Sequence, residues 1–453
     1  MSATAARRLA REVVTRVREG NAYGHEVLAS ALERAKLDGD ERAFATRLAY
    51  GTLQTQGTLD EIIDASHSGR RLEPRVRDAL RVATYEIVFL HTEDRAAVHQ
   101  GVELVKTVRP QASGLANAVL RKVADRAPAF PWGDPNTDIA ALARAYAHPA
   151  WLAHMWVDEL GRDVAASVMA ADNEPAPLYL AANPFAATFA EAMEALEADG
   201  AQPSPGPVPG SILAADAGAA VRGDALASES VLVADAGAQF AAALLPATPG
   251  QTVIEVGAGR GTKTLLLQGA SIAAGGPCEI YAVDLHEFKS RLLENRLEKL
   301  GVLGVTALTG DATHLPAVEG LPDGIAADAI LIDAPCSGLG TLRRHPEKRW
   351  RVLLDDLETL ATLGLSLLRS AAQLVRPGGF VVYSTCTLAE VENAAVIRAF
   401  LASEEGASFS VDSIEAETPQ EWRRFITAEG FFSAWPEVGG PDGHFVARLR
   451  RAE

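Results

Sequence analysis

Two spacings of apolar residues divide this sequence. Between residues 4 and 126 apolar side chains recur every three or four positions, as in Leu9, Val13, Val14 and Val17. That spacing places them on one side of a helix, so we predict several amphipathic helices packed as a compact bundle. From about Val231 onward, short β-branched runs alternate with helical stretches, which is typical of a parallel sheet covered by helices.

The region between these two patterns is mixed. Pro128 to Pro135 interrupts the helical spacing, and we place a boundary there. Beyond it we expect helices over 138–172, a strand over 178–183, a helix over 187–198, a loop over 200–210 and a short strand at 212–213. We therefore predict three domains: an all-α bundle over 1–130, a small α/β linking subdomain over 131–230 and an α/β domain of Rossmann-like architecture over 231–453.

The last domain contains the candidate chemistry. Its expected strands are 252–256, 279–283, 305–308, 329–332, 380–383 and 445–449. In open α/β sheets, ligands bind outside the carboxyl ends of the strands. The residues that directly follow each strand are therefore the first candidates for a functional site.

Two of the three cysteines follow the fourth and fifth expected strands. Cys336 lies in the run Asp333-Ala334-Pro335-Cys336-Ser337-Gly338, and Cys386 lies in Ser384-Thr385-Cys386-Thr387. A buried cysteine is usually inert, but these two lie among Pro, Ser, Thr and Gly at strand ends, so we expect both to line one cleft. Three cysteines make no disulfide framework, and no pair has zinc-ligand spacing, so we expect a reducing, cytoplasmic setting without a metal.

A glycine-rich turn follows the first strand of this domain. Its sequence is Glu255-Val256-Gly257-Ala258-Gly259-Arg260-Gly261-Thr262-Lys263-Thr264. Glycines there let the backbone approach a ligand closely, but the spacing matches neither the dinucleotide fingerprint nor the P-loop. Asp284 ends the second strand and Asp311 follows the third. A carboxylate at Asp284 could accept ribose hydroxyls of NAD or S-adenosylmethionine equally well, with helix capping as the structural alternative.

The net charge of −17 is unevenly distributed. Residues 1–130 carry a net charge of +3, residues 131–245 carry −12 and residues 246–453 carry −8. The total argues against a polyanionic partner, whereas a local basic strip would still attract one. Such a strip, or merely a solvated face, could be formed by Arg7, Arg8, Arg11, Arg16 and Arg18. No apolar run reaches the ~20 residues that a membrane span requires.

The N-terminal bundle resembles the NusB-type RNA-binding domain over about 125 residues. The resemblance rests on Ala97-Val98-His99-Gln100-Gly101-Val102-Glu103-Leu104-Val105-Lys106 and on Gly114-Leu115-Ala116-Asn117-Ala118-Val119-Leu120-Arg121-Lys122. It implies an RNA-binding role for this domain, with Asn117 as a polar residue that fixes helix packing.

The cysteine motifs are similar to those of the Sun-type RNA 5-methylcytosine methyltransferases. The similarity extends to Arg343-Arg344-His345-Pro346-Glu347-Lys348-Arg349-Trp350 and to Asp442-Gly443-His444-Phe445-Val446-Ala447-Arg448. It implies a class I methyltransferase that acts on a cytosine of bacterial small-subunit (16S) ribosomal RNA. It also implies that Cys386 is the nucleophile, that Cys336 assists product release and that Asp333 hydrogen-bonds the base.

The resemblance implies S-adenosylmethionine as the cofactor. Its expected contacts are Glu255, Gly257, Ala258, Gly259, Gly261, Lys263, Asp284, Asp311 and Asp333. The family's first motif usually reads Asp-x-Cys-Ala-Ala-Pro-Gly-Gly-Lys-Thr. Here Glu255, Gly257, Gly259, Arg260 and Thr262 depart from it, which could alter cofactor affinity.

Basic residues ten or so positions beyond Cys336 are expected to contact RNA phosphates: Arg343, Arg344, Lys348 and Arg349. A solvated charge run is the alternative. We expect a monomer. Two other functions stay open: a catalytically impaired RNA-binding assembly factor, suggested by the altered glycine turn, and a dinucleotide-dependent oxidoreductase, in which Cys386 would have no role.

Overall fold

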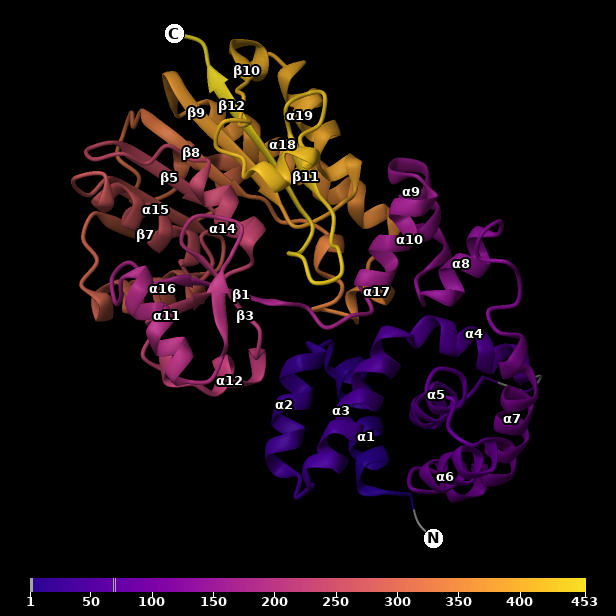
Figure 1. Ribbon diagram of the computed structural model, residues 1–453. Coiled ribbons are helices and arrows are strands. Elements are labelled where there is room, and N and C mark those ends of the chain that lie inside the picture. Colours follow the sequence, from indigo (N-terminus) through magenta and orange to yellow (C-terminus); the bar gives the residue numbers. More distant parts are fainter. Residues whose placement is uncertain (1–2, 68, 70) are drawn as a thin grey trace. The chain divides into compact units, whose positions relative to one another are not determined.

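The computed structural model describes residues 3–67, 69 and 71–453, which form two compact units (Figure 1). The first, here called the helical unit, comprises Met1–Glu174 and Leu342–Leu353. The second, the sheet unit, comprises Pro175–Thr341 and Leu354–Glu453. The stretch that follows Cys336 therefore starts in the sheet unit, passes into the helical unit at residue 342 and returns at residue 354.

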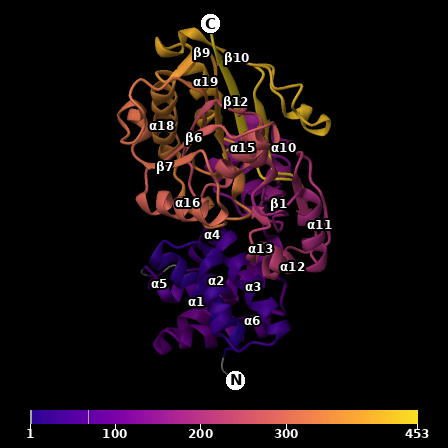
Figure 2. The same ribbon diagram turned by 90° about the vertical axis from the view of Figure 1, so that its left-hand side faces the viewer.

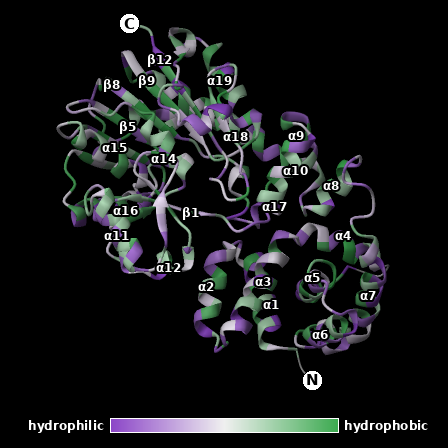
Figure 3. Ribbon diagram, in the orientation of Figure 1, coloured by the Kyte–Doolittle hydropathy of each residue, from purple (hydrophilic) through white to green (hydrophobic). Residues whose placement is uncertain are grey.

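The helical unit begins with seven α-helices, as the apolar spacing predicts. They are α1 (Ala5–Gly20), α2 (Gly24–Arg34), α3 (Gly39–Gln54), α4 (Gln56–Ser66), α5 (Pro74–Val88), α6 (Asp94–Lys106) and α7 (Ser113–Arg126). The apolar stripe of α1 is buried, and Figure 3 shows polar and apolar residues alternating around these helices. Gly101 allows α6 to pack closely, since a Cβ there would lie 2.6 Å from both Ala83 of α5 and Leu120 of α7.

Two of the N-terminal arginines are used inside the bundle. Arg7 pairs with the buried Glu86, and Arg18 pairs with the buried Asp78 at 2.8 Å. A buried carboxylate without a cation would be costly, so these arginines stabilise the helix packing. Arg7 and Arg18 therefore form neither the basic strip nor the solvated face that were the two alternatives from the sequence.

Three more helices and a short one complete the helical unit. They are α8 (Ile139–Ala145), α9 (Ala150–Leu160), α10 (Arg162–Ala171) and α17 (Lys348–Arg351). The predicted boundary near residue 130 therefore falls within this unit, and the helices expected over 138–172 belong to it.

The sheet unit starts with a small antiparallel sheet in the order β2-β3-β1-β4. Its strands are β1 (Leu178–Ala182), β2 (Pro203–Pro205), β3 (Ser211–Ala214) and β4 (Val231–Val233), and its helices are α11 (Phe189–Ala198), α12 (Ala217–Arg222) and α13 (Asp224–Ala227). The loop expected over 200–210 contains β2, which is tolerated with two prolines because it lies at the sheet edge. The predicted boundary at residue 230 would separate β4 from the sheet in which it pairs.

The second sheet has eight strands, seven of them in the order β10-β12-β9-β8-β5-β6-β7, with β11 paired to β12. Figure 2 shows β9, β10 and β12 next to one another near the C-terminus. They are β5 (Thr252–Val256), β6 (Glu279–Asp284), β7 (Val305–Thr309), β8 (Ala327–Asp333), β9 (Val375–Thr385), β10 (Phe409–Val411), β11 (Phe432–Ala434) and β12 (His444–Arg451). The five strands from β9 to β7 are parallel, whereas β12 is antiparallel to β9. This is a Rossmann-like methyltransferase sheet, and the predicted fold class is confirmed.

Helices cover both surfaces of this sheet. One surface packs against α14 (Ala236–Ala243), α15 (Thr262–Ala273) and α16 (Glu287–Leu300); the other packs against α18 (Leu354–Ala372) and α19 (Ala394–Leu401). Neighbouring residues of β5, Val253 and Ile254, belong to the two different cores. Because both surfaces are covered, these strands appear in the sequence as continuous apolar runs.

One strand differs from its expected extent. The fifth strand, expected over 380–383, extends over Val375–Thr385 as β9, and its pairing shifts between Ala327 and Ala329 of β8. The extra residues are accommodated as a bulge. Among the described residues, no helix is long and apolar enough to cross a membrane.

Candidate active site

The two cysteines meet at the carboxyl ends of β8 and β9. These strands are parallel neighbours, with Asp333 of β8 opposite Ser384 of β9. The loops that follow bring the sulfur atoms of Cys336 and Cys386 to 3.5 Å from each other. The structure therefore places the two thiols in one site, within the sheet unit.

Backbone hydrogen bonds fix the paths of the two loops. Ala334 N donates to Ser384 O, and Gly340 N donates to Cys386 O, both at 2.9 Å. Gly443, before β12, donates in turn to Gly340 O at 2.9 Å. A Cβ on Gly340 would lie 2.4 Å from Gly443 O, so this position requires glycine.

Glu392 connects the two loops through its side chain. It lies in a 3₁₀ turn (Glu390–Glu392) before α19 and is 1% exposed. Its Oε1 accepts from Ser337 N at 2.8 Å, and its Oε2 accepts from Ser337 Oγ at 2.6 Å and from Thr387 Oγ1 at 3.2 Å. Ser337 follows Cys336 and Thr387 follows Cys386, so one carboxylate holds the residue after each thiol.

Asn393 fixes the chain on both sides of Cys386. Its Oδ1 accepts from Thr385 Oγ1 at 2.6 Å, and its Nδ2 donates to Thr387 O at 3.0 Å. Burial raises the pKa of the adjacent Glu392, and hydrogen bonds from Ser337 and Thr387 oppose that shift.

A lysine and an aspartate lie beside the thiols. Lys263, in the first turn of α15, donates from Nζ to Asp333 Oδ2 at 2.7 Å. Burial lowers the pKa of Lys263, but the charges of Asp333, Glu255 and Cys386 outweigh it, so the net shift is upward. Lys263 therefore stays a cation that interacts with both Asp333 and Cys386.

The two thiols have different surroundings. The hydrogen bond to Cys386, burial and the charges of Cys386 and Glu392 all raise the pKa of Cys336 well above its ordinary value. Cys386, by contrast, interacts with the Lys263 cation. A negative neighbour disfavours a thiolate, so these surroundings favour a thiol at Cys336, whereas the cation of Lys263 is a neighbour of Cys386.

The glycine turn lies next to the cysteine loops. Gly257, Gly259 and Gly261 all have positive φ, between 59° and 81°. A Cβ on Gly257 would lie 2.5 Å from Asp333 O, whereas one on Gly259 would meet only Gly257 O at 3.9 Å. The turn thus packs against β8 at one glycine and leaves open space at the next, which suits a ligand close to its backbone.

The two predicted carboxylates lie at the ends of neighbouring strands. Asp284, at the end of β6, is buried and accepts from Gly259 N at 3.0 Å and His286 N at 2.9 Å. Asp311, after β7, is an exposed cap whose oxygen accepts from Thr313 N at 2.9 Å. Asp284 is therefore hydrogen-bonded to the glycine turn. Asp311 caps the turn that follows β7, which is the structural alternative that the sequence offered for it.

Glu255 lies behind the turn. It is 1% exposed, and Thr264 donates to its carboxylate at 2.5 Å. Burial raises the pKa of Glu255 to about 7. This placement favours support of the turn from inside over direct contact with a ligand.

This arrangement suits a nucleoside cofactor. An open glycine turn, a helix N-terminus at α15 and carboxylates at successive strand ends are the features by which α/β sheets hold such groups. Among the described residues, no group of three or more His, Cys, Asp or Glu side chains is placed to hold a metal ion.

Comparisons with known proteins agree with this organisation. The model of the 16S rRNA methyltransferase RsmB/F family matches residues 242–450, that of the NusB family matches residues 4–125, and that of the ferredoxin-like domain of RsmF/B-like methyltransferases matches residues 148–221. A probable ribosomal RNA small subunit methyltransferase B from Bacillus subtilis is 31% identical, with 100% of both chains covered. This chain belongs to the RsmB/F methyltransferase family.

Another relative and a solved structure extend the similarity. The ribosomal RNA small subunit methyltransferase B of Thermus thermophilus is 35% identical over 94% of this chain and 92% of its own. The crystal structure of PH0851 covers 100% of both chains with a TM-score of 0.79 at 24% identity. That structure shows a shared fold, and the family resemblance inferred from the sequence motifs is confirmed.

The basic residues expected to bind RNA have different positions. Arg349 is fully buried in the helical unit, where its guanidinium donates to Ala147 O and Asn173 Oδ1 at 2.9 Å and to Asp172 O at 3.2 Å. Burial lowers its pKa to about 10, which the nearby Asp172 opposes. A side chain in this position cannot reach a phosphate, so we no longer expect Arg349 to contact RNA.

Two neighbours of Arg349 also bind the helical unit. Trp350 Nε1 donates to Gln54 O at 2.8 Å, and Arg351 donates to Val17 O at 2.9 Å and Ala22 O at 3.0 Å, at the carboxyl end of α1. Arg343 is buried, whereas Arg344 and Lys348 are half-buried. Residues 347–351 thus dock a segment of the chain onto its own helices.

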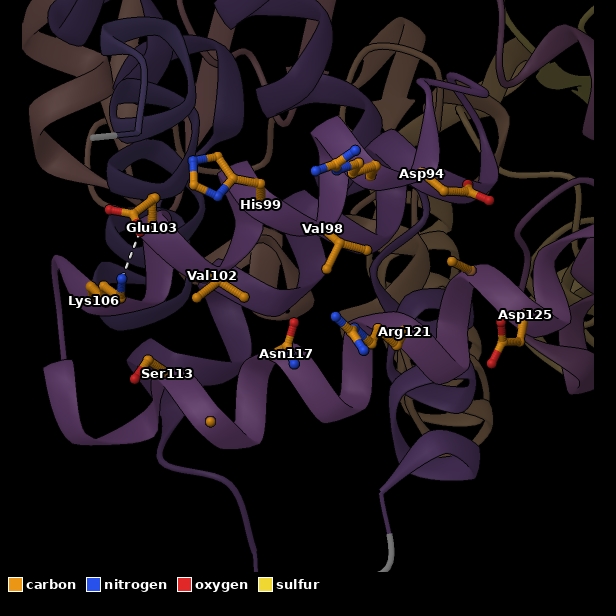
Figure 4. A pocket seen from close by; sticks show the side chains of 13 residues that line it. Asp94, Val98, His99, Val102, Glu103, Lys106, Ser113, Asn117, Arg121 and Asp125 are labelled. Carbon is orange, nitrogen blue, oxygen red and sulfur yellow. Dashed lines mark hydrogen bonds and ion pairs between the residues drawn. The ribbon is translucent and has the colours of Figure 1, made fainter. Parts of the chain in front are cut away.

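The helical unit has a hollow of about 830 Å³ between α6 and α7 (Figure 4). His99 and Glu103 line it from α6, and Asn117 and Arg121 line it from α7. Asn117, which the resemblance assigned to helix packing, thus lies at the edge of an opening. The lining contains three basic residues (Arg95, Lys106, Arg121) and three acidic ones (Asp94, Glu103, Asp125), so its charge does not favour phosphate.

The sequence did not point to Glu392 or Asn393, nor to Ser337 and Thr387 as connecting residues. An acidic residue six positions after Cys386 resembles an ordinary first-turn residue of the following helix. Only the fold shows that its carboxylate is buried between two loops.

Proposed function

We propose that this protein transfers a methyl group from S-adenosylmethionine to carbon 5 of a cytosine in small-subunit (16S) ribosomal RNA. The reaction would pass through a covalent bond between Cys386 and carbon 6 of the base. The observation that carries this proposal is the pair of thiols 3.5 Å apart in unequal electrostatic surroundings. Membership of the RsmB/F family supports the RNA substrate.

The first step follows from the need to activate carbon 5, which is a weak nucleophile. The Cys386 thiolate, favoured by Lys263, adds to carbon 6 and forms an S–C bond. The electron pair moves toward carbon 5 as a proton from solvent adds to ring nitrogen 3, to be returned on release, while Asp333 hydrogen-bonds the base and stabilises its protonated ring. Lys263 orients Asp333 through their 2.7 Å ion pair.

The cofactor would occupy the glycine turn, with Asp284 and Asp311 on its ribose and adenine side. When bound, it supplies an electrophilic methyl group on a sulfonium sulfur. Bound there, the donor would supply its methyl group to carbon 5 and would leave as a neutral thioether. The turn, Asp333 and the thiols lie on adjacent strand ends, which supports a donor and a base held side by side.

Release requires removal of the carbon 5 proton. In the adduct Cys386 is a neutral thioether, so its charge and its hydrogen bond no longer raise the pKa of Cys336. Cys336 can then lose its own proton and accept the one from carbon 5. The S–C6 bond breaks, the double bond re-forms and Cys386 leaves as a thiolate.

The target cytosine must leave its stack to reach these thiols, so an unpaired or flipped base is implied. We propose Arg344 and Lys348 as phosphate contacts, while Arg343 is too buried for a major part. The NusB-type bundle would add further RNA contacts.

The test is adduct trapping with the purified protein, small-subunit rRNA and S-adenosylmethionine. Cys336→Ala should accumulate a denaturation-resistant protein–RNA complex, because release stalls. Cys386→Ala should form no complex and transfer no methyl group, and mass spectrometry of the wild-type product should locate 5-methylcytosine. Methyl transfer by Cys386→Ala would refute the proposal. Folded protein that binds no donor in calorimetry would favour the impaired assembly factor instead.

A further inference from the structure

A side chain that lies outside the two cysteine motifs connects the loops that carry the thiols. Cys336 and Cys386 are on separate loops, and the direct contact between their side chains is the 3.5 Å approach of the sulfurs. A contact between two sulfur atoms is weak and cannot by itself order two loops. Backbone hydrogen bonds from Ala334 to Ser384 and from Gly340 to Cys386 join the loops on either side of Cys336, and a side chain that joins the residues next to the thiols would add to them.

Glu392 has the position and the burial for this task. Its carboxylate accepts three hydrogen bonds, two from Ser337 and one from Thr387, and Ser337 Oγ also lies 2.8 Å from Thr387 Oγ1. Tyr383 OH donates to the backbone oxygen of Glu392 at 2.9 Å, which fixes the glutamate to β9. The carboxylate has no contact with Lys263, Asp333 or the glycine turn in the described hydrogen bonds.

We propose that Glu392 is a positioning residue that holds the Cys336 and Cys386 loops at their working separation. It touches neither the base nor the cofactor and acts through Ser337 and Thr387. This inference rests on the proposed function for its effect on catalysis. Its geometric content, that Glu392 sets the distance between the thiols, can be tested without RNA.

A glutamate is specifically suited to this position. One oxygen accepts the backbone N–H of Ser337, while the other accepts two hydroxyls at once, and buried donors without acceptors would be costly. A glutamine keeps one acceptor oxygen but replaces the other with a donor. An alanine removes all three hydrogen bonds, so effects should increase from Glu392→Gln to Glu392→Ala.

The geometric test uses phenylarsine oxide, a reagent that bridges two close thiols. Its arsenic forms one bond to each sulfur, the two thiol protons leave with the arsenic-bound oxygen as water, and no oxidation occurs. The folded wild-type protein should bind one equivalent tightly. Cys336→Ala, with a single thiol at the site, gives the background. Glu392→Ala should bind at least about tenfold more weakly than wild type, and Glu392→Gln should lie between.

The catalytic test measures methyl transfer by the same variants. A displacement of about 1 Å costs on the order of 100-fold in rate, so Glu392→Ala should lower kcat by about that factor with KM changed less than about threefold. Partial rescue is expected for Glu392→Gln. Glu390→Gln, two residues away and half-exposed, is the matched control and should behave as wild type.

A double variant keeps the inference testable if Glu392→Ala does not fold. Ser337→Ala combined with Thr387→Val keeps the glutamate but removes two of its three hydrogen bonds, and it should reproduce the effects of Glu392→Gln. Unchanged arsenical binding and kcat in folded Glu392→Ala would overturn the inference. So would an activity loss that only matches the fraction of unfolded protein. If wild type binds the arsenical but methylates no cytosine, the proposed function fails while the geometric inference stands.

Discussion

The stretch from Asp333 to Leu353 consists of two halves that are anchored in different ways. Its first half, up to Thr341, belongs to the sheet unit and is held by short hydrogen bonds to Glu392 and to backbone atoms of the next loop. Its second half belongs to the helical unit, where Arg349, Trp350 and Arg351 donate to helix carbonyls. One continuous segment thus combines a reactive loop with a docking element.

The comparison separates two uses of charge that look alike in a sequence. In the first half Asp333 pairs with Lys263, and Glu392, from outside the stretch, accepts hydrogen bonds from Ser337. Guanidinium groups in the second half satisfy carbonyls at helix ends, which is a structural use. A basic run next to a catalytic motif therefore does not by itself indicate phosphate binding.

The largest effect is expected in the first half, at Asp333. Asp333→Asn removes the ion pair with Lys263 and the charge that would stabilise the protonated base, so kcat should fall on the order of 100- to 1,000-fold. Steady-state methyl transfer to rRNA measures this. Asp323→Asn, in an exposed loop before β8, is the control. A loss of less than about tenfold would remove Asp333 from the catalytic site.

In the second half, Arg349→Met should disturb structure rather than chemistry. The substitution leaves Ala147 O, Asp172 O and Asn173 Oδ1 without this donor, at a cost of about 3 kcal/mol. Amide exchange over residues 342–353, followed by mass spectrometry, should accelerate on the order of 100-fold. Phenylarsine oxide binding at the cysteines should not change. Lys348→Met, half-buried on the same turn, should leave the exchange rates near those of wild type.

The buried carboxylates behind the first half should make the stability of the sheet unit depend on pH. Glu255 has a pKa of about 7 when folded, compared with 4.5 as its ordinary value, because burial disfavours its charge. The folded state therefore holds more protons between these values, and stability must fall as pH rises from about 4.5 to about 7. The loss is at most about 3 kcal/mol, and the upward shift of Glu392 acts in the same direction.

Glu255→Gln should reduce this dependence. Calorimetric melting at about pH 5 and about pH 8 should show a smaller decrease for the variant than for wild type. Glu279→Gln, at the exposed start of β6, provides the matched control. A variant with the full wild-type decrease would show that Glu255 is ionised throughout.

The sequence predicted what depends on local pattern. The strands β5 to β9, the glycine turn and both cysteines could be placed because apolar runs and strand ends fix them. The use of Arg349 and Glu392 could not be predicted, since their partners, Ala147 and Ser337, are far away in the sequence. A three-residue edge strand such as β2, between two prolines, likewise carries no local signal strong enough to distinguish it from a loop.

The smallest effect is expected from the half-buried basic residues of the second half. If Lys348 contacts a phosphate, Lys348→Ala should weaken RNA binding severalfold and reduce the salt slope of log K by about 1. Arg344→Ala should act in the same way. The measurement is a titration of rRNA at several salt concentrations, with Arg222→Ala, in helix α12 of the sheet unit, as the control. A salt slope equal to that of wild type in both variants would mean that the entire basic run serves the packing of the chain, and that RNA is bound by other parts of the protein.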